Sequence, residues 1–159
     1  MSFYAKNTSV SVEKSRAEIE SCLARYGASA FAYATNNNKA MIQFQSNGKR
    51  IMFILELPDR ADRIYTHGYG GRGRKLGEQE AYGKWEQACR QKWRCLALAI
   101  KAKLEAVESK IASFEDEFMA HIVMPDGKTV SHHMRPVIEH AYETGKFKPS
   151  DLDALEYKP

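Results

Sequence analysis

Residues 78–111 of the chain read EQEAYGKWEQACRQKWRCLALAIKAKLEAVESKI and contain no proline. Apolar residues recur here at intervals of three or four, the spacing that forms one stripe along an α-helix. The stripe consists of Trp85, Cys89, Trp93, Leu96, Ile100, Leu104, Val107 and Ile111. Such a helix would extend for about 50 Å at about 1.5 Å per residue. We therefore expect the other elements of the chain to pack along it, with Trp85 and Trp93 as core anchors.

A helix and three strands are predicted ahead of the long helix. Ser11 can cap a helix over 12–26, and Gly27 suits the position that ends it. Apolar and polar residues then alternate along three segments, which is the period of a strand with one buried face. These segments are 29–35, 40–45 and 50–57.

Two turn signals connect the strands into an antiparallel meander. The NNNK segment, 36–39, favours a turn because asparagine tolerates positive φ, and Asn47-Gly48 is typical of a tight hairpin. The apolar face of so small a sheet needs a cover, which the first helix and the long helix can supply. The sequence therefore predicts an α+β fold with an α-β-β-β-α core domain over 1–112.

Residues 113–159 are predicted to form a C-terminal extension that packs on this core. Its predicted elements are a short helix over 113–119, a β-hairpin with strands at 121–124 and 129–130, and a last helix over 133–144 that ends at Gly145.

Composition places the chain among ordinary globular proteins, with 43% hydrophobic and 28% charged residues. No apolar run reaches the length of about 18 residues that a membrane-spanning helix needs, and the first ten residues do not resemble a secretory signal. The cysteines, Cys22, Cys89 and Cys95, lack metal-binding spacing and predict reduced thiols in the cytoplasm. We expect no cofactor, no metal ion and no membrane partner.

Basic residues are concentrated in the middle of the chain. The net charge of +4 is too small to indicate a nucleic-acid partner by itself. The stretch from Arg60 to Lys103, however, contains eleven Lys and Arg residues and only four acidic residues, whereas 105–117 is acidic. This distribution predicts a basic surface near the first half of the long helix.

The segment 58–77, PDRADRIYTHGYGGRGRKLG, is the leading candidate for a functional site. We expect a mobile surface loop, because it has little apolar surface to bury. Its arginines match phosphate groups and its tyrosines offer stacking faces, which suits single-stranded DNA. The alternative is a solvated loop that only keeps the protein soluble. The predicted nucleic-acid-binding residues are Arg63, Tyr65, His67, Tyr69, Arg72, Arg74 and Lys75 in this segment, and Arg90, Lys92, Arg94 and Lys101 on the long helix.

Motifs for catalysis are weak by comparison. The glycine-rich segment lacks the GxxxxGK[ST] pattern of a P-loop. The five histidines have no zinc-binding spacing, and the acidic cluster Glu115-Asp116-Glu117 is explained by a helix start. Glu56 with Asp59 has only a faint likeness to a nuclease strand, so a metal-dependent nuclease is the third choice. We expect a protein that is not an enzyme.

Four blocks of the sequence resemble a family of small proteins encoded in bacteriophage and prophage genomes. The blocks are SVEKSRAEIESCLARYGASAFAYA, WEQACRQKWRCLALAIKAKLEAVES, SFEDEFMAHIVMPDGKTV and MRPVIEHAYETG, and the resemblance covers roughly residues 8–146. It implies a bacterial cytoplasm and an accessory role for a phage. The family has no established activity, so the resemblance assigns no functional residue.

Two alternatives concern protein partners. The long helix or the last helix could bind a host or anti-phage defence protein, as an inhibitor or adaptor. The chain could also form a homo-oligomer if the end of the apolar stripe, Leu104, Val107 and Ile111, is exposed. The C-terminal elements could instead cover that end within one chain.

Overall fold

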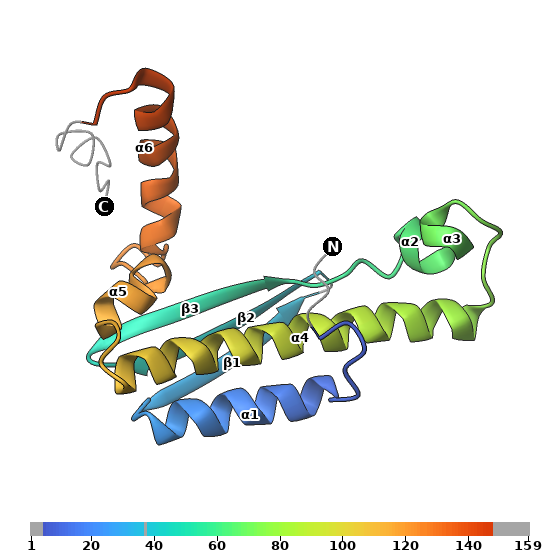
Figure 1. Ribbon diagram of the computed structural model, residues 1–159, viewed down its shortest axis with the longest axis horizontal. Coiled ribbons are helices and arrows are strands. Elements are labelled where there is room, and N and C mark those ends of the chain that lie inside the picture. The colour runs from blue at the N-terminus through green and yellow to red at the C-terminus, as the bar shows by residue number, and fades with distance from the viewer. Residues whose placement is uncertain (1–4, 37, 148–159) are drawn as a thin grey trace.

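The computed structural model describes residues 5–36 and 38–147, in which helices cover one face of a three-stranded antiparallel sheet (Figure 1). The predicted α+β fold, with the long helix packed on the sheet, is confirmed. In chain order the elements are α1 Val12–Arg25, β1 Ala30–Asn36, β2 Lys39–Ser46, β3 Lys49–Glu56, α2 Arg63–Thr66, α3 Gly68–Gly71, α4 Glu78–Glu108, α5 Phe114–Phe118, the 3-10 helix η1 Met119–His121, and α6 Val130–Thr144.

Helix α1 begins and ends where its capping residues predict. The Ser11 side chain accepts a hydrogen bond from the backbone N–H of Lys14 at 3.1 Å, which satisfies a free donor of the first turn. Gly27 has a φ of 81°, the left-handed conformation that favours glycine after a helix. Ile19 and Leu23 face the core and are buried. The apolar face of α1 thus packs into the same core as α4.

The strands pair in the order β1-β2-β3, as an antiparallel meander. Ile42 lies opposite Phe53 and Phe44 lies opposite Ile51, and all four side chains are buried. On the opposite face of the sheet, Ile54 of β3 is exposed. The alternation of the sequence therefore assigns the correct residues to the buried face.

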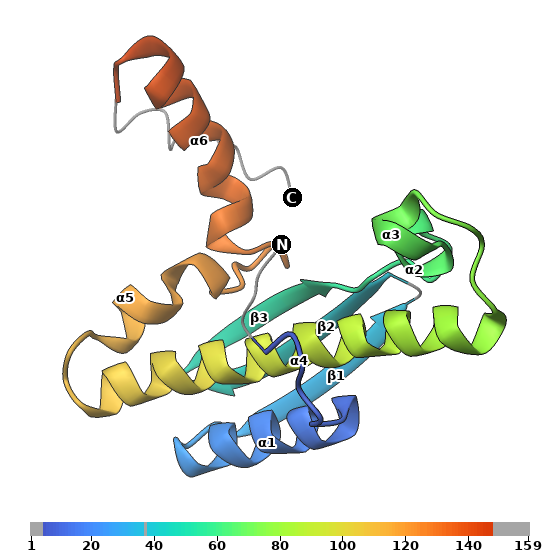
Figure 2. The ribbon, with the colours of Figure 1, turned by 45° about the vertical axis from the view of Figure 1, so that its right-hand side comes forward.

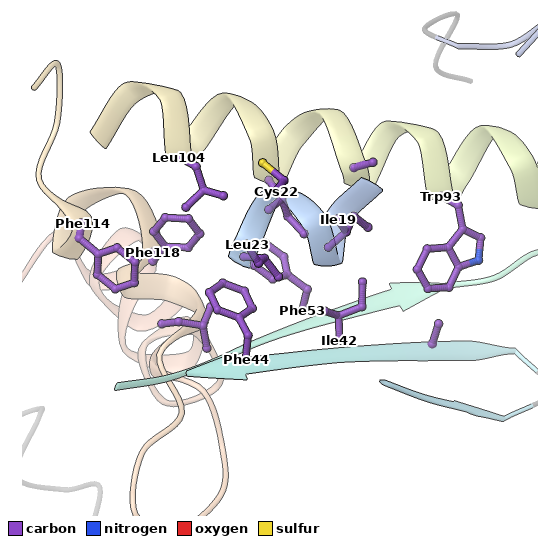
Figure 3. Packing of buried hydrophobic residues seen from close by; sticks show 14 residues of the cluster. Ile19, Cys22, Leu23, Ile42, Phe44, Phe53, Trp93, Leu104, Phe114 and Phe118 are labelled. Carbon is purple, nitrogen blue, oxygen red and sulfur yellow. The ribbon is translucent and has the colours of Figure 1, made fainter. Parts of the chain in front are cut away.

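Helix α4 lies along the buried face of the sheet, with Trp93 and Leu104 directed at the strands (Figure 3). Trp93 is 2% exposed and its ring centroid is 5.5 Å from that of Tyr33. The prediction that Trp93 anchors the core is confirmed. The helix ends at Glu108, however, and Ile111, which is 80% exposed, does not belong to the buried stripe.

The end of α4 is covered within the chain by α5. Leu104 is 4% exposed and belongs to the same core cluster as Phe114 and Phe118 of α5. A capping box between Ser113 and Asp116 begins α5, because each residue's side chain interacts with the other's backbone N–H. The C-terminal elements thus cover Leu104 within one chain, which is the arrangement that we considered in place of a homo-oligomer.

The predicted β-hairpin is reduced to a tight loop with single bridges. Val123 pairs with Thr129, while Ile122 pairs with Ile51 of β3. The backbone N–H of Val123 donates to the carbonyl of Arg50 at 2.8 Å, so this part of the loop adds to the edge of β3 instead of extending a ladder of its own. The prediction of two separate strands at 121–124 and 129–130 is corrected accordingly.

Helix α6 projects away from the sheet and from α4 (Figures 1 and 2). It begins at Val130, three residues before the predicted start, because the Thr129 side chain caps it by accepting from the backbone N–H of His132 at 3.3 Å. Its contacts with the body run mainly through η1. Residues 148–159 of the predicted extension lie outside the described residues. None of the helices described is long and apolar enough to cross a membrane.

Candidate nucleic-acid interface

The glycine- and arginine-rich segment, predicted as a mobile surface loop, contains two short helices in the structure. We call residues 62–76, which include α2 and α3, the α2–α3 segment. The Asp62 side chain caps α2 by accepting from the backbone N–H of Ile64 at 3.1 Å. The backbone N–H of Gly73 donates to Gly68 at 2.8 Å, and that of Leu76 donates to Thr66 at 2.9 Å. These backbone hydrogen bonds close the segment on itself without a hydrophobic core of its own.

Helix α2 packs against α4, where Tyr65 lies near Cys89. Cys89 is buried on α4, and its burial, with a smaller contribution from the charge of Glu86, raises the pKa of the thiol to about 11. Burial also raises the pKa of Tyr65, and both Asp62 and Cys89 contribute to this shift. Tyr65 is therefore a packing residue of the segment, not an exposed stacking platform.

Tyr69 is the most exposed aromatic side chain of the α2–α3 segment, at 92% of its full accessible area. Its backbone is left-handed, with φ 47° and ψ 46°, and Gly70 follows with φ 65°. The ring lies beside Gly73, where an added Cβ would be 2.8 Å from the Tyr69 Cδ2 atom. The backbone therefore holds the tyrosine outward while one edge of its ring rests on a glycine.

Three cations follow this tyrosine closely in the chain: Arg72, Arg74 and Lys75. All three are exposed, and their side chains make no hydrogen bond or ion pair with the part of the chain that the structure describes. We call Tyr69 and these three cations the tip. Arg63 differs, because its Nε donates to the carbonyl of Gly71 at 3.3 Å and thereby braces α3. The remaining predicted residue of the segment is His67, whose ring nitrogen Nδ1 forms a hydrogen bond with the Thr66 hydroxyl at 3.0 Å.

The predicted cations of α4 are not brought to the tip. Arg90 pairs with Glu86 at 2.9 Å, and Arg94 pairs with Glu18 of α1. In both views α1 lies below α4 and the α2–α3 segment lies above it (Figures 1 and 2). The acidic partners of Arg90 and Arg94 also reduce the field that these cations could offer to phosphate.

Lys92 and Lys101 are both exposed on α4. Burial raises the pKa of Cys22 in α1, and the charge of Lys101 partly opposes this, which places Lys101 near α1. Lys92 lies two residues before Arg94 and therefore points to another side of the helix. The structure thus divides the predicted set into a tip with unpaired cations and separate positions along α4.

A hollow beside Trp85 is the feature that the sequence does not reveal. Its volume is about 650 Å³, and it is lined by Asn38, Asp59, Arg60, Ala61 and Trp85. The prediction that Trp85 is a core anchor like Trp93 needs correction, since Trp85 is partly exposed at the hollow. Both tryptophans lie on the same apolar stripe, so the spacing of residues contains no signal that separates them.

The acidic residues near α5 all have partners of their own. Glu115 pairs with Lys49 at 2.8 Å, Glu117 pairs with Lys103 at 3.0 Å, and Asp116 belongs to the capping box. Lys49 and the backbone of α5 hold the pKa of Glu115 below its usual value. Among the described residues, no three His, Cys, Asp or Glu side chains are grouped so that they could hold a metal ion.

The fold and the tip define a small α+β protein with a folded, cation-bearing projection at one end of its long helix. No protein-family model matches the chain, and no curated protein or solved structure matches it either. The resemblance to small bacteriophage proteins therefore stays a prediction.

Proposed function

We propose that the protein binds single-stranded nucleic acid, with DNA as the favoured ligand, and that the tip is its contact surface. The observation that carries the proposal is the exposure of Tyr69, at 92%, next to three cations with no acidic partner. The proposed activity is binding without a catalytic step. The resemblance to phage-encoded proteins suggests a role in phage replication or recombination.

The chemistry of the tip suits a single strand better than a duplex. Arginine and lysine attract the phosphates and release counterions, which makes binding salt-dependent. An exposed tyrosine ring can stack on an unpaired base, whereas the bases of a duplex are already stacked. The backbone hydrogen bonds of the α2–α3 segment fix the backbone that carries these groups before the strand arrives, which lowers the entropy cost of binding.

We predict that the triple variant Arg72→Ala, Arg74→Ala, Lys75→Ala binds a labelled single-stranded oligonucleotide more weakly and with less salt dependence. Each phosphate contact contributes about −0.7 to the slope of log K against log salt for single strands, so three lost contacts flatten the slope by about 2. Fluorescence anisotropy across a series of salt concentrations measures both quantities.

A matched variant separates local contacts from overall charge. Lys14, Arg135 and Lys146 are exposed cations outside the α2–α3 segment, and their replacement with alanine removes the same three positive charges from the total of +4. We expect this control to bind nearly as the unaltered protein does. Equal losses in the two variants would contradict the tip as the site, and no binding by the unaltered protein at low salt would reject the proposed function.

Helix α6 supports a second candidate function, the binding of a host or defence protein. Ile138 is 50% exposed and Tyr142 is 88% exposed, and the two lie four residues apart on one face of a projecting helix. A helix with apolar residues at this spacing can insert into a groove of another protein. This observation is independent of the tip.

We predict that Ile138→Glu with Tyr142→Glu abolishes the retention of any protein partner from nuclease-treated bacterial lysate, because charge on this face opposes burial. The control is His140→Glu, which adds a negative charge to an exposed position on another face of α6. A partner retained equally by both variants would exclude α6 as its site. Oligonucleotide binding should be unchanged in both.

A further inference from the structure

We infer that the hollow beside Trp85 accommodates an unpaired base of the strand held by the tip. The inference rests on the proposed function and adds a second contact point to it. The hollow lies where the turn between β1 and β2, represented by Asn38, meets the link from β3 to α2 and the first turns of α4. Its volume of about 650 Å³ is within the range of about 300–1,000 Å³ typical of ligand sites.

The indole of Trp85 is fixed before any ligand binds. Its Nε1–H donates to the backbone carbonyl of Pro58 at 2.9 Å, and its ring centroid is 5.5 Å from that of Tyr82. Because the N–H is already used, the ring can offer a ligand only its apolar surface. An immobilised aromatic surface suits the face of a planar base, which stacks on it without sequence preference.

Polar groups line the rest of the hollow. One carboxylate oxygen of Asp59 accepts from the backbone N–H of Ala61 at 2.9 Å, which fixes the side chain of Asp59. Asn38 adds an exposed side-chain amide with both donors and an acceptor. Unpaired bases carry donors and acceptors along their edges, and these are the groups that an amide and a carboxylate recognise.

Arg60 adds a positive charge at the same place. Its guanidinium lies 5.1 Å from the centre of the Tyr82 ring, and it remains more than half exposed despite a pair with Glu78 at 3.8 Å. A guanidinium at the rim can contact the phosphate that follows a base. The hollow is therefore lined by a stacking surface, hydrogen-bonding groups and a guanidinium that can bind phosphate.

The shape of the hollow favours a base that is part of a strand over a free metabolite. It opens widely to solvent, whereas sites for free small molecules usually bury about 70–90% of the ligand surface. A base on a strand already held elsewhere needs less burial, since its local concentration is high. Ala61 lines the hollow and directly precedes Asp62, the cap of α2, so the hollow and the tip belong to one continuous stretch of chain.

The test compares an oligothymidylate with an abasic oligonucleotide of equal length, which has the same phosphates but no bases. We expect Trp85→Leu to weaken the binding of oligothymidylate by about 5- to 150-fold, the range of one base–aromatic contact. The affinity for the abasic strand should not change. Trp85→Phe, which retains an aromatic ring, should restore most of the affinity for oligothymidylate.

The fluorescence of Trp93 reports the integrity of the fold in these variants, because this residue is buried in the core and does not line the hollow. If Trp85→Leu binds both strands as the unaltered protein does, the base site is overturned while the proposed function stands. An equal loss for both strands would also overturn it, since the residue would then act without a base. If the unaltered protein binds neither strand, the proposed function and the base site fall together.

Discussion

Replacing Phe118 with alanine is expected to lower the free energy of unfolding by about 3–5 kcal/mol, the usual cost of a buried phenylalanine. Phe118 is 0% exposed. Its ring meets those of Phe44 and Phe53 edge-on, at centroid distances of 6.1 and 6.4 Å, and stacks on Phe114 at 4.7 Å. The substitution removes these contacts and leaves a cavity where α5 meets β2 and β3.

Chemical denaturation followed by tryptophan fluorescence measures this loss. Met119 is the matched control, because it is the next residue and is half exposed, so Met119→Ala should change stability by no more than about 0.5 kcal/mol. A single transition shifted to lower denaturant is expected, since Phe118 contacts the sheet directly. An unchanged main transition with new protease cleavage near residue 112 would instead make 113–159 a separate unit and would contradict the prediction that this extension packs on the core.

The elements that local sequence determines were predictable. Asn47 and Gly48 adopt positive φ values of 50° and 71°, as their hairpin sequence requires. The strand alternation and the cap of α1 are local in the same sense. The end of α4 was not predictable in this way, because Ile111 continues the helical spacing while the chain leaves the helix, with Lys110 at a φ of 56°. The turn allows Phe114 to return to the core, which is a tertiary effect.

In the candidate site, too, some features follow from local sequence and others depend on tertiary contacts. Sequence identified the cations of the tip, since clustered arginine and glycine are visible without a structure. It could not show that Arg94 is paired, because its partner Glu18 lies 76 residues away in the chain. The sequence also could not show that the α2–α3 segment is folded. Its structure depends on backbone hydrogen bonds and on left-handed residues such as Tyr69, and these produce no periodic pattern of apolar residues.

Gly71→Ala is expected to detach the α2–α3 segment from its packed position and to abolish binding at the tip. Gly71 is buried and has a φ of 93°, which an alanine adopts only with strain of about 1–3 kcal/mol. An added Cβ would also lie 3.2 Å from the carbonyl carbon of Arg63 and 3.3 Å from the backbone nitrogen of Ile64. These are backbone atoms of α2, so they cannot rotate aside as the end of a side chain could.

The reactivity of Cys89 measures directly whether the α2–α3 segment detaches from α4. Its pKa of about 11 under the segment should return toward the ordinary 9.0 when the segment lifts, which raises the thiolate fraction at pH 8 about 100-fold. The measurement is the rate at which iodoacetamide alkylates each cysteine, followed by peptide mass spectrometry. Cys22, buried between α1 and α4, is the internal reference and should not change.

Gly83→Ala is the matched control, because Gly83 lies inside α4 with no atom within 4 Å of an added Cβ. This variant should gain about 0.5–1 kcal/mol from helix propensity and should label Cys89 at the original rate. If Gly71→Ala also left the labelling of Cys89 unchanged, the close approach of Gly71 to Arg63 would not be what holds the segment. If labelling increased while oligonucleotide binding persisted, the tip would not need its fixed geometry, and pre-organisation would no longer explain the proposed binding.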